Sequence, residues 1–79
     1  MPTVLRELGY RFVVFVDEPD EPAHVHAIKA NSEAKFWLSP VALEWSRGFR
    51  QHDLREIAGI LEKYAGFLIH EYEKIHSKK

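Results

Sequence analysis

The spacing of apolar residues changes once along this chain of 79 residues, and the change constrains the fold more than any other feature. In the first half, apolar residues recur near every second position, which is typical of strands. From Leu54 onward they recur with a period near 3.6, which is typical of a helix. No low-complexity linker and no internal repeat interrupts the sequence. The order therefore predicts one α+β domain over residues 1–79, with sheet first and helix afterwards.

Short runs of β-branched and aromatic residues predict a small antiparallel sheet of three to four strands. The acidic stretch DEPDEP contains two prolines and is predicted to be a loop, because proline cannot donate to a sheet ladder. The predicted strands are a short piece at Val4 and Leu5, a run from Tyr10 to Val16, HVHAIKA at 24–30 and AKFWL at 34–38.

A turn at Asn31 and Ser32 joins the last two runs. If these two residues form the hairpin loop, His26 faces Trp37 and His24 faces Ser39. One face of the sheet is then apolar and is predicted to form the core; it holds Phe12, Val14, Val16, Val25, Ala27, Ala34, Phe36 and Leu38. The other face points away from the core and carries Arg11, Phe15, Asp17, His24, His26, Ile28, Lys35 and Trp37.

Two helices are expected in the second half. Ser39 resembles an N-cap with Pro40 in the first helical position, and Gly48 resembles a C-terminal cap, so Pro40 to Arg47 is predicted to be a short helix. A longer helix follows, with an apolar stripe from Leu54 to Ile75 that is wide enough to cover a sheet face.

Composition excludes several classes of protein. The chain has no cysteine, so neither a disulfide nor a thiolate metal site can form, and a reducing cytoplasm is the expected location. No apolar run approaches the roughly 18 residues of a membrane span, so no membrane association is expected. The formal net charge of -1 gives no argument for nucleic-acid binding by the molecule as a whole.

The chemical feature that stands out is the pair His24 and His26. On a strand these positions lie roughly 6.6 Å apart on one face, so both imidazoles can converge on one small object. If that object is a phosphodiester, one histidine acts as base and the other as acid, while Arg11 or Lys35 stabilises the developing charge. Trp37, on the same face, is the candidate for stacking on a base.

Two other interpretations of the pair remain open. In one, His24 and His26 bind zinc, with Asp17 or Glu21 as a third ligand. In the other, both are surface residues of a strand without chemistry. We expect no cofactor and no bound metal, and we take the two histidines as candidate catalytic residues and Arg11, Lys35 and Trp37 as candidate substrate-binding residues.

Ile60 and Phe67 form a second apolar patch on the long helix. They lie together, displaced by roughly 100° from the centre of the core stripe. Exposed apolar patches tend to mark interfaces, so these two residues are the candidate partner interface unless another part of the domain covers them.

Four motifs in a fixed order carry a resemblance to a known family. They are MPTVLRELGYRFVVF, a Pro-x-His-Val-His element ending at His26, AKFWLSPVAL, and GFxxxDLREI. Together they resemble the bacterial family known as domain of unknown function 4160, over nearly the whole chain. The chain departs from the family pattern at Ala23, where a second proline is usual, at Ala30 to Ser32, where a Gly-Asp-Gly-like turn is usual, and at Arg50, where a serine cap is usual.

The resemblance implies a compact bacterial protein that is often encoded beside another small domain, as toxins and antitoxins are. It implies no reaction. We therefore expect a member of a toxin-antitoxin-type gene pair that acts on RNA through the His-x-His face. The alternative is a non-catalytic interaction module whose partner is a small protein encoded nearby or a second copy of the chain.

Overall fold

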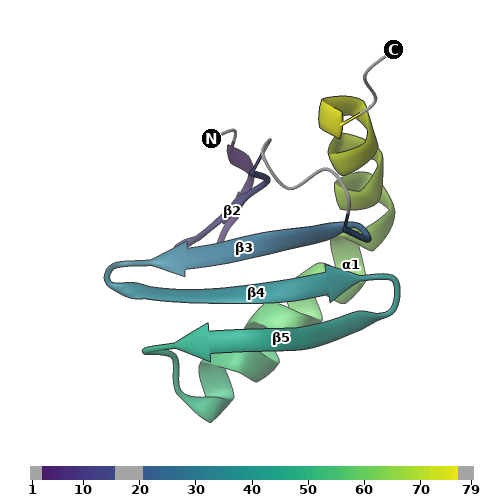
Figure 1. Ribbon diagram of the computed structural model, residues 1–79. Helices are drawn as coiled ribbons and strands as arrows, with labels where there is room; N and C mark the ends of the chain where they lie inside the picture. The colour runs from purple at the N-terminus through teal and green to yellow at the C-terminus, as the bar shows by residue number, and fades with distance from the viewer. Residues whose placement is uncertain (1–2, 16–20, 77–79) are drawn as a thin grey trace.

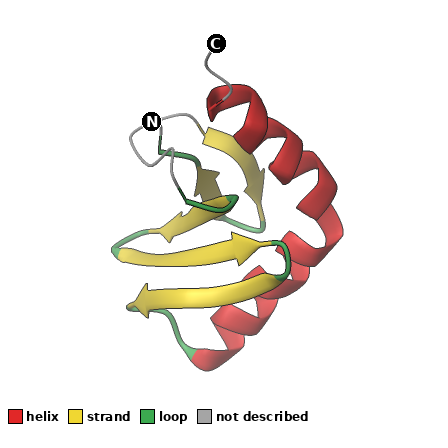
Figure 2. Cartoon of the chain, turned by 45° about the vertical axis from the view of Figure 1, so that its right-hand side comes forward, coloured by secondary structure: helices red, strands yellow, loops and turns green. Residues whose placement is uncertain are grey.

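The computed structural model describes residues 3–15 and 21–76 as an antiparallel sheet with one long helix across a face (Figures 1 and 2). The strands lie in the sheet in the same order as in the chain. The elements are β1 (Thr3–Glu7), β2 (Tyr10–Val13), β3 (His24–Lys29), β4 (Ser32–Leu38), β5 (Val41–Arg47) and α1 (Gln51–His76). The α+β class is as predicted, but in the described residues the sheet has five strands and there is a single helix.

The predicted helix from Pro40 to Arg47 is wrong, because this segment is strand β5. Ser39 and Pro40, joined by a cis peptide bond, form the turn after which Val41 pairs with Leu38. Pairing with β4 gives backbone N–H and C=O groups of this segment hydrogen-bond partners. A helix of eight residues would be only marginally stable by itself. Gly48 has a φ of 93° and directs the chain from β5 toward α1 instead of capping a helix.

The predicted loop between β3 and β4 is displaced by one residue. The turn residues are Ala30 and Asn31, so Lys29 pairs with Ser32, and each β3 residue faces a partner two positions earlier than predicted. His26 therefore lies opposite Lys35, and His24 lies opposite Trp37. Because side chains alternate with a period of two, a shift of two positions leaves every residue on its predicted face.

The core lies between the sheet and α1, on the predicted apolar face. The β3 and β4 residues assigned to that face are all at most 2% exposed. The α1 residues that pack against these strands in the core come from the predicted stripe, with the addition of Ile60, which is 7% exposed. The buried residues of α1 are Ile57, Ile60, Leu61, Leu68 and Tyr72.

Asp53 stabilises the N-terminus of α1. The backbone N–H of Arg50 donates to Asp53 Oδ2 over 3.1 Å, which is half of a capping box. This hydrogen bond holds the pKa of the Asp53 carboxyl below its usual value. The helix therefore begins at Gln51, three positions before the apolar stripe.

Parts of the prediction fall beyond what the structure describes. The strand end at Val16 and the acidic loop from Asp17 to Asp20 lie outside the described residues. Among the residues that are described, no helix is both long and apolar enough to cross a bilayer.

Candidate functional site

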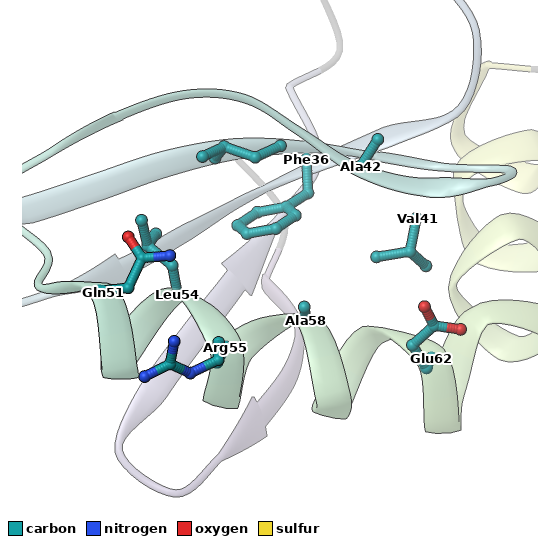
Figure 3. Close-up of a pocket in the computed structure, with 9 residues that line it drawn as sticks. Phe36, Val41, Ala42, Gln51, Leu54, Arg55, Ala58 and Glu62 are labelled. Carbon is teal, nitrogen blue, oxygen red and sulfur yellow. The ribbon is translucent and has the colours of Figure 1, made fainter.

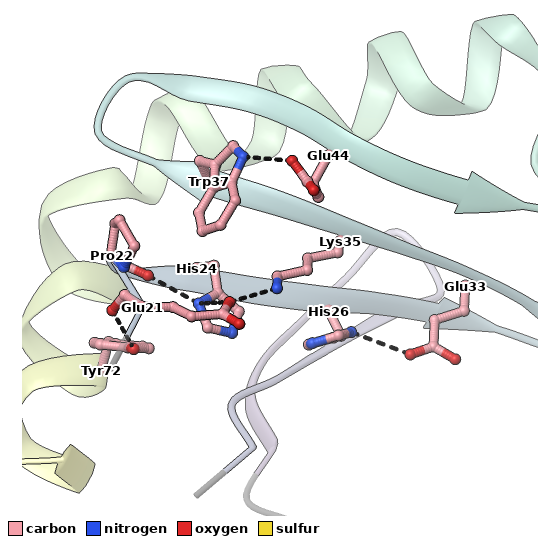
Figure 4. A network of polar contacts seen from close by, with 9 residues as sticks. All are labelled: Glu21, Pro22, His24, His26, Glu33, Lys35, Trp37, Glu44 and Tyr72. Carbon is pink, nitrogen blue, oxygen red and sulfur yellow. Dashed lines mark hydrogen bonds and ion pairs between the residues drawn. The ribbon is translucent and has the colours of Figure 1, made fainter. Parts of the chain in front are cut away.

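The two histidines lie on the sheet face opposite the core residues Val25 and Ala27, as predicted, but their side chains are inside the protein, where Tyr72 near the end of α1 lies beside His24 (Figure 4). His24 is fully buried and His26 is 4% exposed. Their ring centroids are 5.7 Å apart, close to the expected spacing on a strand.

Aromatic side chains cover both imidazoles. The ring of Phe15 lies 4.3 Å from that of His26, and Trp45 of β5 lies 6.0 Å from it on another side. The rings of Trp37 and Tyr72 lie 5.7 and 5.4 Å from that of His24. A phosphodiester would reach either imidazole only after these rings had moved.

Each histidine has a polar contact in the protein. His24 Nδ1 lies 2.8 Å from the carbonyl oxygen of Pro22, and His26 Nδ1 lies 3.1 Å from Glu33 Oε2. In the Pro22 contact His24 Nδ1–H donates to the carbonyl oxygen, which fixes the ring orientation. These contacts suit imidazoles that are held in place as part of the structure.

The candidate substrate-binding residues are engaged in the same network. Lys35 is 8% exposed and forms an ion pair with Glu21, and its Nζ lies 4.9 Å from the centre of the Trp37 ring. Trp37 Nε1 donates to Glu44 Oε1 over 3.0 Å, which connects β4 to β5. The structure thus brings Lys35 and Trp37 to the histidine pair, but their polar groups already have protein partners.

Arg11 lies farther along the same face. It pairs with Ile28, whereas Val13 of β2 is the residue opposite His26. Of the two carboxylates considered as zinc ligands, Asp17 lies outside the described residues, and Glu21 pairs with Lys35. In the described part of the chain, no three His, Cys, Asp or Glu side chains are grouped so that they could hold a metal ion.

The two residues predicted to bind a partner do not form one surface. Ile60 is 7% exposed and belongs to the core cluster, so this chain itself covers it. Phe67 remains 47% exposed on α1.

A second candidate site, which the sequence did not reveal, lies at the β5 edge of the sheet. β5 is the last strand in the sheet order, and no described strand pairs with its outer side. All its residues from Ala42 to Arg47 are exposed. Leu43, at 45%, and Trp45, at 39%, are among the most exposed large apolar side chains in the described residues.

A pocket of about 260 Å³ opens between β5 and the first half of α1 (Figure 3). Its apolar part comes from the sheet and from two helix positions, and three polar side chains of α1 complete it. The lining residues are Phe36, Val41, Ala42, Leu43, Leu54 and Ala58, with Gln51, Arg55 and Glu62.

The signal for β5 was present in the sequence. Val41, Leu43 and Trp45 alternate with small or polar residues, which is the pattern of a half-buried strand. The Ser-Pro start and Gly48 outweighed this pattern in the prediction, so the edge and its pocket were missed.

One of the comparisons with known proteins gives a match. The family described as Domain of unknown function (DUF4160) matches residues 9–73. No curated protein and no solved structure matches the chain.

Proposed function

The chain belongs to the family described as Domain of unknown function (DUF4160), and we propose that it is a non-catalytic module that binds a small partner protein at the edge of β5. The observation that carries this proposal is the exposed β5 edge with an apolar pocket directly beneath it. The family resemblance implies a protein that is often encoded beside another small domain. The expected partner is therefore a small cytoplasmic protein encoded beside this one.

An edge strand presents backbone N–H and C=O groups that another strand can pair with. Proteins usually protect such edges with charge, proline or a covering element. On β5, Glu44 contacts Trp37 and Arg47 lies 3.6 Å from Glu33, so both of its charged side chains turn back to the domain. Leu43 is left exposed at the centre of the strand.

The pocket supports strand addition more than contact with a flat surface. Side chains of an added strand alternate between the two sheet faces. Those on the α1 side would enter the space between β5 and Leu54, Arg55 and Ala58. In strand addition, main-chain hydrogen bonds supply affinity and such pockets supply specificity.

Catalysis on RNA receives less support from the geometry. General acid-base chemistry requires an imidazole within hydrogen-bonding reach of the substrate. His24 and His26 are at most 4% exposed and lie under four aromatic rings. We therefore propose the interaction module and do not assign these residues a reaction.

The proposal is tested with the Leu43→Lys variant. We expect the parent chain to co-elute with the product of the adjacent gene in size-exclusion chromatography, and Leu43→Lys to lose the complex while it keeps its circular dichroism spectrum. Leu8→Lys is the matched control, because Leu8 is 61% exposed in the turn between β1 and β2. It should bind as the parent does.

Two results would count against this role. One is a parent chain that forms no complex with the neighbouring product. The other is a complex that survives Leu43→Lys but is lost in Phe67→Asp, which would move the interface to the exposed side of α1.

A further inference from the structure

We propose that the segment accepted beside β5 runs antiparallel to it and carries an acidic residue, then an aliphatic residue two positions later, then a basic residue two positions after that. This inference rests on the proposed function and specifies the chemistry of the partner. The aliphatic residue follows from the size of the pocket, and the charged residues follow from the two opposite charges on its helical wall. The antiparallel direction follows from the slightly greater stability per residue of antiparallel strand pairs.

The size and lining of the pocket specify the aliphatic residue. Its volume of about 260 Å³ lies below the roughly 300–1,000 Å³ of small-molecule sites, which suits one inserted side chain better than a separate ligand. Phe36, Val41, Leu54 and Ala58 give it an apolar lining. Burying a leucine- or isoleucine-sized side chain there removes apolar surface of both partners from water.

The charged residues of the pocket specify the other two positions. Arg55 and Glu62 lie on the same wall, and neither makes an ion pair with another residue in the described part of the chain. They are seven positions apart on α1, or roughly 10.5 Å along the helix. Residues four apart on a strand span roughly 13 Å, and long side chains accommodate the difference.

The direction of α1 orders the two charges along β5. The chain turns back after Gly48, so the start of α1 lies near the Arg47 end of β5 (Figure 1). Farther along the helix, Glu62 lies on the Val41 side of the pocket, whereas Gln51 and Arg55 lie on the opposite side (Figure 3). A strand antiparallel to β5 passes Arg55 first and Glu62 last. Its acidic residue therefore precedes its basic residue.

This order argues for a different protein as the occupant. None of the five described strands has an acidic, an aliphatic and a basic residue at alternate positions in this order. In β5, for example, Leu43 and Arg47 flank Trp45, and Glu44 is a bulge residue without a partner in β4. The described strands of a second copy thus offer no complementary sequence.

Two capped peptides, TETLTKT and its reverse TKTLTET, test the inference by titration into the full ¹⁵N-labelled chain. The first should shift the amide signals of β5 and of Arg55 to Glu62, with a Kd about five- to tenfold lower than that of the reverse peptide, since two surface ion pairs are exchanged for two repulsions. Replacing the leucine of TETLTKT by alanine should also raise its Kd, because the pocket is then left unfilled.

A protein variant provides the reciprocal test. Arg55→Glu/Glu62→Arg should reverse the preference between the two peptides. The control Lys63→Glu/Glu73→Arg changes exposed charges of α1 that do not line the pocket, and should leave the preference unchanged.

The outcomes separate this inference from the proposed function. If neither peptide binds while the complex with the neighbouring gene product still depends on Leu43, the sequence order is wrong and the partner role stands. Tighter binding of the reverse peptide would overturn the antiparallel direction. A parent dimer that becomes monomeric in Leu43→Lys would place a second copy at this edge and overturn the inference.

Discussion

At the scale of single residues, His24 and His26 show that the face of a side chain and its burial are separate properties. Alternation along β3 places both on the face away from the core, and the packing of Val25 and Ala27 in the core cluster confirms this face. Their burial comes from residues distant in the sequence, such as Trp45 and Tyr72. No local pattern around His24 reports that a ring from α1 lies 5.4 Å away.

We predict that His24→Ala/His26→Ala lowers the free energy of unfolding by about 1 to 3 kcal/mol, because the substitution leaves the Pro22 carbonyl and Glu33 without these partners. Urea denaturation measures the change. His52→Ala is the control, because its side chain is 71% exposed, and it should change stability far less. An unchanged midpoint for the double variant would mean that the imidazoles contribute nothing to the packing.

At the scale of elements, the glycines of the second half fall into two kinds. Gly59 and Gly66 lie within α1, and a Cβ added at either would meet no atom within 4 Å. Gly48 adopts a φ of 93°, and a Cβ there would lie 2.5 Å from Ser32 Oγ. The first two positions therefore tolerate a side chain, and the third does not.

Gly59→Ala and Gly66→Ala should each stabilise the isolated chain by about 1 kcal/mol, since alanine has the higher helix propensity and the space is open. Gly48→Ala should destabilise it, because alanine strains this backbone conformation. Thermal unfolding followed by circular dichroism compares all three variants. If Gly59→Ala lowered the melting temperature, the space around that residue would have to be filled.

The misassigned β5 shows why some elements were predictable and others were not. The stripe of α1 spans more than twenty residues, so its period dominates any local ambiguity. Ser39, Pro40 and Gly48, which flank the seven residues of β5, suggest helix caps, while Val41, Leu43 and Trp45 within β5 alternate with small or polar residues. Only pairing with β4 decides between the two, and that pairing is a tertiary contact.

At the scale of the whole molecule, Tyr10 joins the two layers. Its hydroxyl donates to Glu56 Oε1 over 2.7 Å and lies 3.4 Å from Asp53 Oδ1, so β2 is connected to the start of α1. Lys29 Nζ lies 4.7 Å from the centre of the Tyr10 ring. Burial and the hydrogen bond to the Glu56 carboxylate raise the pKa of the Tyr10 phenol well above its usual 10.0.

The stability of the protein should therefore fall as pH rises above about 10. In that range the unfolded chain ionises Tyr10, whereas the folded chain keeps it protonated, so proton release favours unfolding. Tyr10→Phe should cost about 1 kcal/mol at pH 7, from the lost hydrogen bond, and should make the alkaline decline less steep. Urea midpoints between pH 7 and 11 measure both effects, and Tyr64→Phe is the control. Parallel declines for parent and Tyr10→Phe would contradict the assignment.

How much of the molecule could be predicted also depends on scale. The α+β class, the core faces and the main stripe of α1 follow from repeating patterns and were predicted correctly. The pocket under β5 depends on where Leu54 and Arg55 of α1 meet Val41. Such a meeting of distant segments has no periodic signature, so the second candidate site became visible only in the fold.

The sheet order β1-β2-β3-β4-β5 also has a consequence for biosynthesis. Because every strand pairs with the next in the chain, the relative contact order of the sheet is low, and its hairpins form soon after each second strand leaves the ribosome. α1 is translated after all five strands. Until it is complete, the apolar side of the nascent sheet has no helix to bury it, so this is the stage of synthesis at which the exposed apolar surface favours aggregation most.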